Sequence, residues 1–187
     1  MSSHHIVREK QEPALYIHHL GNFDEEYLGQ LLEWSPTLIV NAATYEKVLS
    51  LGLKIDAVVS NTEQNFFQEN TRVIKANKEE LDAVLDFLIG EQYAAVNVID
   101  SEANLRELGS YIDALNIVVF TAQEKAYAVK PGFKIWKPRG SIFNIEVISY
   151  FETSNLKQNR DEQFEVMEDG FVTFNFTTPY LFISEKL

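Results

Sequence analysis

The sequence predicts an α/β protein with a mainly parallel, doubly wound sheet, followed by a small C-terminal β-sandwich. Over the first two-thirds of the chain, short β-branched runs alternate with amphipathic helical patterns, as right-handed βαβ units do. After Thr121, short strand patterns separated by Gly and Pro turns replace this alternation. We therefore expect an α/β domain at residues 1–122 and a β domain at residues 123–187.

The first domain is predicted element by element. Its strands are short apolar runs rich in β-branched residues, expected at Ala14–Ile17, Thr37–Val40, Ala57–Val59, Arg72–Lys75, Ala95–Ile99 and Ile117–Phe120. Its helices show apolar residues at helical spacing and are expected at Asp24–Trp34, Tyr45–Leu51, Lys78–Ile89 and Ala103–Leu115. The acids from Asp24 to Glu26 favour a helix start, and Gly52 stands where a helix end is expected.

The second domain is expected to contain only strands and turns. The strands are predicted at Ala126–Val129, Lys134–Trp136, Ser141–Ile148, Phe164–Met167, Phe171–Phe176 and Tyr180–Ser184. Turn dipeptides such as Pro131-Gly132 and Asp169-Gly170 separate them. The polar stretch Glu152–Glu162 has no periodicity, so we expect a surface loop there.

Composition narrows the function classes. A net charge of −12, from 28 acidic and 16 basic side chains, makes nucleic acid a poor partner. The absence of cysteine excludes disulfides and thiol chemistry. No apolar run reaches the length of a membrane span, and Met1–Lys10 lacks the apolar region of a secretory signal. We expect a cytoplasmic protein that does not bind membranes.

The histidines are confined to the start of the chain, at His4, His5, His18 and His19. Chemistry in the rest of the chain must therefore use carboxylates, lysine, tyrosine or a metal-bound water. His18-His19 could form a transition-metal site. Adjacent side chains on an extended segment point to opposite faces, however, so the sequence favours a structural role for this pair.

Acidic residues gather where a doubly wound sheet binds its ligands, beyond the carboxyl ends of the strands. They are Glu63, Glu79, Glu80, Asp82, Asp100 and Glu102. Such carboxylates can hold Mg²⁺ against a nucleotide phosphate. Acids in the first turn of a helix can also serve only to stabilise the helix dipole. Both interpretations remain open for Glu79 and Glu80.

Two segments resemble the thiamine pyrophosphokinase family. Val40–Glu63 resembles the family pattern D-G-(A/G), helix, L-G and G-D-(F/L)-D, with Leu51-Gly52 and Asp56 matching. Asn77–Ile89 resembles the family's D-K-T-D-L-E helix start, with Lys78 and Leu81 retained. Short sequence stretches near the N-terminus resemble those of Bacteroidetes-type members of the family. The resemblance covers most of residues 1–120.

The resemblance implies a fold, a ligand set and an assembly. The family transfers pyrophosphate from ATP to thiamine with Mg²⁺ held by aspartates, and it is dimeric. The positions that match imply residual catalytic roles for Glu63, Glu80 and Asp82, with Glu63 and Glu80 as Mg²⁺ ligands. They also imply binding of nucleotide or thiamine by Lys78, Ser154 and Asn155. The implied partners are a second copy of the chain and a thiamine or nucleotide ligand.

The departures from the family pattern concern its reactive residues. The first aspartate of the family falls at Ala42 and that of G-D-(F/L)-D at Asn61, while Asn77 replaces another. The G-R-x-D-H-T segment of the family has no counterpart here. Three interpretations follow: a catalytically eroded paralogue that binds or assembles, an active Mg²⁺-dependent diphosphokinase using Glu63, Glu80 and Asp82, or a non-enzymatic interaction protein.

Overall fold

The computed structural model describes residues 10, 12–61, 68, 70–102, 104–145, 151–160 and 163–187. The chain divides into two compact units, Met1–Ile117 and Val118–Leu187. The division falls within strand β6, Asn116–Phe120. All residues of the candidate site described below lie in the first unit.

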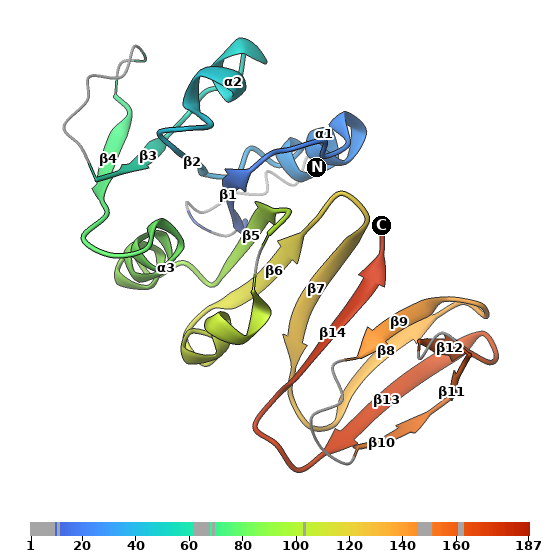
Figure 1. Ribbon diagram of the computed structural model, residues 1–187. Helices are drawn as coiled ribbons and strands as arrows, with labels where there is room; N and C mark the ends of the chain where they lie inside the picture. The colour runs from blue at the N-terminus through green and yellow to red at the C-terminus, as the bar shows by residue number, and fades with distance from the viewer. Residues whose placement is uncertain are drawn as a thin grey trace, which may run out of the picture. The chain divides into compact units, whose positions relative to one another are not determined.

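The first unit is built on a parallel sheet with connecting helices (Figure 1). In spatial order its strands are β5 (Ala95–Asp100), β1 (Ala14–His19), β2 (Leu38–Asn41), β3 (Ala57–Ser60) and β4 (Arg72–Lys75). The four recorded pairings among these strands are all parallel. The helices are α1 (Glu25–Leu32), α2 (Tyr45–Ser50) and α3 (Glu80–Gly90). The predicted α/β class is confirmed, and the doubly wound arrangement stays a prediction.

Strand β1 lies inside this sheet, between β5 and β2, and its first four residues are apolar without interruption. Ala14–Ile17 are completely buried, as expected for a parallel strand with neighbours on both sides. The strand pairs with β2 on one side and β5 on the other. Its carboxyl end therefore lies between the carboxyl ends of two other strands.

The predicted helix Ala103–Leu115 is wrong in type and length. The structure has a short 3₁₀ helix, η1 (Leu105–Ser110), and turns follow it. Asn104 caps η1 by accepting a hydrogen bond from the Arg106 amide at 3.2 Å. Leu108 is the one buried residue of η1. A single buried anchor and the low helix propensity of Gly109 and Ser110 explain why no longer helix forms.

The second unit consists of antiparallel strands in two sheets. One sheet has the order β11 (Leu156–Gln158), β12 (Phe164–Val166), β9 (Ile142–Ile145), β14 (Leu181–Lys186) and β7 (Glu124–Val129), and β6 pairs with β7. The other has the order β10 (Phe151–Ser154), β13 (Gly170–Phe176) and β8 (Phe133–Lys137). Both sheets contribute to one apolar core, which includes Phe143, Val166, Phe174 and Ile183. The arrangement fits the predicted small β-sandwich.

The predicted surface loop Glu152–Glu162 is wrong over most of its length. Strands β10 and β11 occupy residues 151–158, with Asn155 between them. Asn155 adopts a left-handed backbone conformation with φ of 60°. These strands pair with β13 and β12, so cross-strand hydrogen bonding compensates for their low apolar content.

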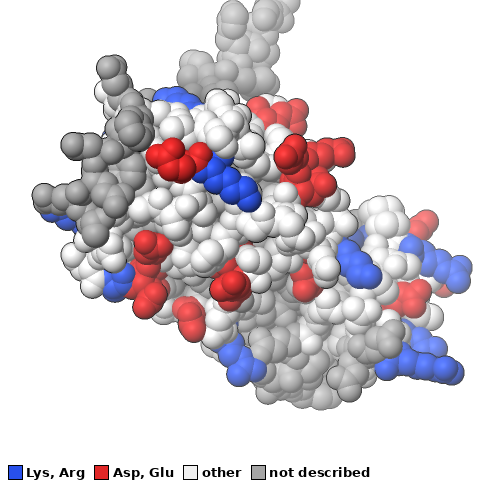
Figure 2. Space-filling view, turned by 45° about the horizontal axis from the view of Figure 1, so that its top comes forward, with Lys and Arg blue, Asp and Glu red and all other residues white. Residues whose placement is uncertain are grey.

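On the face that Figure 2 presents, acidic and basic residues are interspersed, and the described part of that face has no continuous basic patch. No helix among the described residues has the length and apolarity needed to cross a bilayer.

Candidate functional site

The candidate site begins at an irregularity near the end of β1. Pairing between β1 and β5 is regular up to Ile17, which lies opposite Ile99. The register then shifts, so that His19 lies opposite Asp100. Such a bulge interrupts the alternation of side chains along a strand. His18 and His19 therefore do not follow the alternation that ordinary strand geometry predicts.

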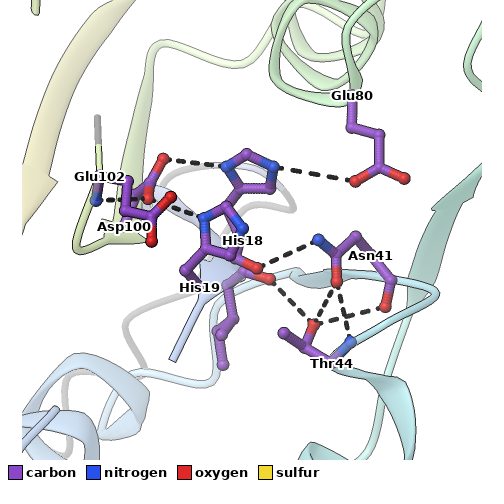
Figure 3. Close-up of polar contacts among 8 residues, drawn as sticks. His18, His19, Asn41, Thr44, Glu80, Asp100 and Glu102 are labelled. Carbon is purple, nitrogen blue, oxygen red and sulfur yellow. Dashed lines mark hydrogen bonds and ion pairs between the residues drawn. The ribbon is translucent and has the colours of Figure 1, made fainter. Parts of the chain in front are cut away.

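Both histidines contact the same carboxylate. Nδ1 of His18 lies 2.9 Å from Oδ2 of Asp100, and Nδ1 of His19 lies 2.9 Å from Oδ1. An ionised carboxylate only accepts hydrogen bonds, so both Nδ1 atoms donate. The two rings are 4.1 Å apart between centroids. The prediction that these side chains point to opposite faces is wrong, because the bulge brings them together (Figure 3).

Asp100 is a buried anion with several donors around it. It is 3% exposed, and its Oδ1 also accepts a hydrogen bond from the Glu102 amide at 2.9 Å. Burial alone raises the pKa of Asp100. The hydrogen bonds from His18, the Glu102 amide and His19, with the charge of His18, outweigh burial and lower this pKa to about 2. Asp100 is therefore ionised at neutral pH.

Glu80 approaches His18 from the other side. It lies in the first turn of α3, and its Oε2 is 3.8 Å from Nε2 of His18. This distance is too long for a hydrogen bond but short enough for an ion pair. The imidazole of His18 thus lies between two carboxylates, one on β5 and one on α3 (Figure 3).

A network of amide and hydroxyl groups holds the neighbouring end of β2. The Asn41 side chain donates to the carbonyl of His18 at 3.1 Å. Its oxygen accepts from the amide of Thr44 at 2.9 Å and from the hydroxyl of Thr44 at 2.8 Å. Asn41 is 3% exposed. Its carboxamide therefore fixes the turn after β2 to the end of β1.

Tyr16 contributes a buried hydroxyl to the same region. Its ring stacks on His18 with centroids 5.4 Å apart and an interplanar angle of 25°. The residue is completely buried, and its hydroxyl has no hydrogen-bond partner among the described residues. Burial raises the pKa of Tyr16, and the charges of Glu80 and Asp100 raise it further. An unpaired buried hydroxyl costs about 1–3 kcal/mol.

Of the predicted catalytic acids, Glu80 lies beside the histidines and Asp82 does not contact them. Asp82 accepts a hydrogen bond from the Tyr111 hydroxyl at 2.9 Å. Residues two apart on a helix do not face each other, which explains why these two acids have different neighbours. Glu63 lies outside the described residues.

Lys78 lies near Glu80 but interacts with other groups. Its Nζ is 2.6 Å from Oδ2 of Asp86 and 3.3 Å from the Tyr111 hydroxyl. Lys78 and Glu80 also border a hollow of about 460 Å³, whose lining includes His18, Asn61, Asn77 and Glu79. The hollow is large enough for a small polar ligand.

Ser154 and Asn155 belong to the second unit, where the structure shows what they contact. The Ser154 hydroxyl pairs with that of Thr173 at 2.7 Å. The Asn155 side chain donates to the Glu168 carbonyl at 2.7 Å and accepts from the Glu168 amide at 2.9 Å. Both side chains therefore support strand and turn structure within that unit.

The histidine pair is the feature that the sequence analysis undervalued. Asp100 was expected at the end of a strand, but its contact with His18 and His19 was not. One signal in the sequence pointed to it: two adjacent histidines end a central parallel strand, and an acid ends another. Carboxyl ends of parallel strands meet at one edge of a sheet.

Comparison with known proteins gives first a fold class and then particular structures. No protein-family model matches the sequence, and no curated protein matches it. The fold, an α/β unit with a parallel sheet followed by an antiparallel β unit, resembles that of solved thiamine pyrophosphokinases.

Three solved structures illustrate this likeness. The thiamine pyrophosphokinase from Bacillus subtilis has a TM-score of 0.70 at 14% identity, covering 93% of this chain and 98% of that chain. The enzyme from Candida albicans has a TM-score of 0.66 at 8% identity, covering 92% and 90%. The yeast enzyme has a TM-score of 0.70 at 7% identity, covering 94% and 86%. At these identities the likeness shows the fold alone.

Among the described residues, the donors at this edge of the sheet do not fit the Mg²⁺ that the fold family implies. Mg²⁺ takes oxygen ligands in near-octahedral geometry. Strand β2 ends at Asn41 and is followed by Ala42, while β3 is followed by Asn61. The carboxylates of Asp100, at the end of β5, and Glu80, in the first turn of α3, face imidazole nitrogens. Imidazole is a ligand for transition metals and not for Mg²⁺.

Proposed function

We propose that this chain is a thiamine pyrophosphokinase-like protein that has lost pyrophosphate transfer and acts by binding a ligand or a partner. It would be a degenerate relative of the Bacteroidetes type, which short sequence stretches near its N-terminus resemble. The fold likeness to enzymes of that name supports the relationship. The replaced acids support the loss of the reaction.

One observation carries the proposal: the side chains at the end of β2 are committed to structure. The Asn41 side chain donates a hydrogen bond to the His18 carbonyl and accepts hydrogen bonds from the amide and hydroxyl of Thr44. The next residue, Ala42, occupies the position where the resemblance places an aspartate, and its side chain has no oxygen atom to bind a metal. Pyrophosphoryl transfer depends on positioned metal ions and phosphates, so losing such a carboxylate removes part of what the reaction needs.

A turnover assay with a binding measurement tests this proposal. Purified protein is incubated with ATP, Mg²⁺ and thiamine, and thiamine diphosphate is quantified, with the Bacillus subtilis enzyme as positive control. We expect no product above the protein-free background. Product at about 1 s⁻¹ or faster, the lower range of enzyme turnover, would contradict the proposal. Titration calorimetry with thiamine, thiamine diphosphate and ATP plus Mg²⁺ then shows which ligand, if any, still binds.

The second candidate is an active Mg²⁺-dependent diphosphokinase that uses Glu63, Glu80 and Asp82. The observation in its favour is the hollow beside α3, where Lys78 and Glu80 lie together. If this candidate is right, Glu80→Ala and Asp82→Ala should each weaken Mg²⁺-nucleotide binding. The exposed residue Glu26, on α1, gives a control variant, Glu26→Ala, that should bind as the parent does. Unchanged binding in both test variants would exclude the candidate.

Other expectations belong to the same proposal. A homodimer follows from the resemblance and is checked by light scattering of the eluting protein, which reports the mass in solution. A mass of about 21.5 kDa, that of a single chain, would contradict it. The cytoplasmic location and the roles of Lys78, Ser154 and Asn155 in nucleotide or thiamine binding stay predictions.

A further inference from the structure

The end of β1 brings together a set of donors that the proposed function does not use. His18, His19 and Asp100 each offer a ligand atom, and these atoms lie within 4.8 Å of one another. We propose that they form a binding site for a divalent transition-metal ion of the Zn²⁺ type, with Glu80 as an outer partner. The inference does not depend on whether pyrophosphate transfer is lost.

The chemistry of the donors selects the class of metal. Two imidazoles and one carboxylate bind Zn²⁺ and its first-row neighbours, whereas Mg²⁺ and Ca²⁺ require oxygen ligands. Three protein ligands leave one position of a tetrahedral ion for water or another ligand. The set therefore resembles an open metal site more than a closed structural one.

The distances suit a shared ion. Each Nδ1 lies 2.9 Å from an Asp100 oxygen. Two ligands of one tetrahedral Zn²⁺ are roughly 3.3 Å apart, given metal–ligand bonds of about 2.0–2.1 Å. These contacts involve different oxygens of Asp100, and the ligand atoms lie within 4.8 Å of one another. Side-chain shifts of up to about 1.5 Å would thus bring them to the spacing of a shared ion.

Glu80 provides the partner that such a histidine needs. When Nδ1 of a neutral histidine binds a metal, the remaining ring proton sits on Nε2. A metal-bound histidine usually donates this proton to a carboxylate or carbonyl. Nε2 of His18 faces Oε2 of Glu80 at 3.8 Å. A shift of under about 1 Å would let Glu80 accept this proton in a hydrogen bond, so that it orients His18 without binding the metal itself.

Tyr16 gives a second observation that points to a ligand. Its buried hydroxyl has no hydrogen-bond partner within the described parts of the chain. The ring stacks on His18, and Glu80 and Asp100 lie close enough for their charges to affect it. A buried polar group normally has a partner, so the unpaired hydroxyl beside the His18 ring is a polar group that a bound ligand could satisfy.

Metal titration of the untagged full chain tests the site. The protein is treated with EDTA, and Zn²⁺ binding is measured by calorimetry while Co²⁺ binding is followed by visible absorption. The histidines His4 and His5 lie outside the described residues, so a His4→Ala, His5→Ala double variant serves as control. We expect one equivalent of metal in the parent and in this control, with a Co²⁺ spectrum typical of four ligands.

Variants of the proposed site should distinguish the metal ligands from the outer partner. His18→Ala and His19→Ala should each weaken binding by about 100-fold or more, and Glu80→Gln by about 10–100-fold, the usual effect of an outer partner. Glu26→Gln, a change in an exposed acid on α1, should leave affinity unchanged. Because the His19 side chain is 44% exposed, its variant should fold even if a change at buried Asp100 does not.

Three outcomes would overturn the proposal. One is that the parent binds no stoichiometric Zn²⁺ or Co²⁺. Another is that His18→Ala and His19→Ala bind as the parent does. The third is that binding disappears in the His4→Ala, His5→Ala variant, which would assign the metal to the N-terminal histidines.

Discussion

Position 155 requires a left-handed backbone and a side chain that bridges two segments. Asn155 meets both needs, with φ of 60° and two hydrogen bonds to the backbone of Glu168. Asn155→Ala should lower the free energy of unfolding by about 2–3 kcal/mol, from lost hydrogen bonds and backbone strain. Asn155→Gly keeps the backbone conformation accessible and should cost about 1–2 kcal/mol. Equal losses in denaturant titrations of the two variants would contradict the backbone argument.

Glu185 makes the second unit sensitive to acid. Burial alone raises the pKa of Glu185, but hydrogen bonds from Lys137 and Tyr127, with the charge of Lys125, outweigh burial and lower it. The folded state therefore releases this proton more readily than the unfolded chain. Its stabilising effect is complete above the unfolded pKa of about 4.3 and is lost as pH falls through the folded pKa.

Replacing Glu185 tests this pH dependence. Glu185→Gln should lower stability at pH 7 by about 1–3 kcal/mol, since charged hydrogen bonds are lost. It should also make stability fall less steeply below pH 5 than in the parent. Exposed Glu165 on β12 gives the control, Glu165→Gln, which should change neither. Chemical denaturation at a series of pH values measures both effects, and an unchanged acid slope in Glu185→Gln would refute the argument.

Residue types in the sequence indicated carboxylate chemistry, but not which carboxylate meets which partner. Glu80 was expected at a ligand site, and it does lie beside His18. Asp82, two residues further along α3, instead contacts Tyr111. The Asp100 contact to both histidines joins positions more than 80 residues apart in sequence. Only the pairing of β1 with β5 could reveal it.

Helix α1 shows how a single cap defines an element. Asp24 accepts hydrogen bonds from the amides of Glu26 at 2.9 Å and Tyr27 at 3.1 Å. Asp24→Ala should lower stability by about 0.5–2 kcal/mol. Asp24→Asn keeps an oxygen acceptor and should cost less. Thermal unfolding of both variants checks this, and equal destabilisation would show that charge rather than capping matters.

Helices and strands were predicted well where apolar residues are regularly spaced. They were predicted poorly where hydrogen bonds to a neighbouring strand determine the structure. The central strands and α3 have many buried side chains, and their patterns were clear in the sequence. Strands β10 and β11 are polar, and they form because β13 and β12 offer partners. The bulge at the end of β1 has no local signal either, since it depends on the register with β5.

At the scale of the whole chain, charge predicts which partners are disfavoured. The net charge is −12, and acidic and basic groups are interspersed on the face in Figure 2, without a continuous basic patch in its described part. The chain should therefore show no binding to single- or double-stranded DNA at physiological salt. Fluorescence anisotropy with labelled oligonucleotides measures this. Saturable binding at micromolar protein would contradict the prediction.

The fold class was predictable because alternating strands and helices leave few topologies. The sequence predicted the α/β start and the all-β end of the chain, and the structure confirms both. The candidate site was less predictable, since sequence alone cannot place side chains at a bulge. The histidines were identified but assigned to opposite faces.

The bulge in β1 changes which residues of the strand share a face of the sheet. In a regular strand, odd and even positions belong to different faces, so neighbouring residues serve different surfaces. The register shift beyond Ile17 suspends that rule for His18 and His19. A sheet can thus place two adjacent donors on one anion while its buried strands keep their packing.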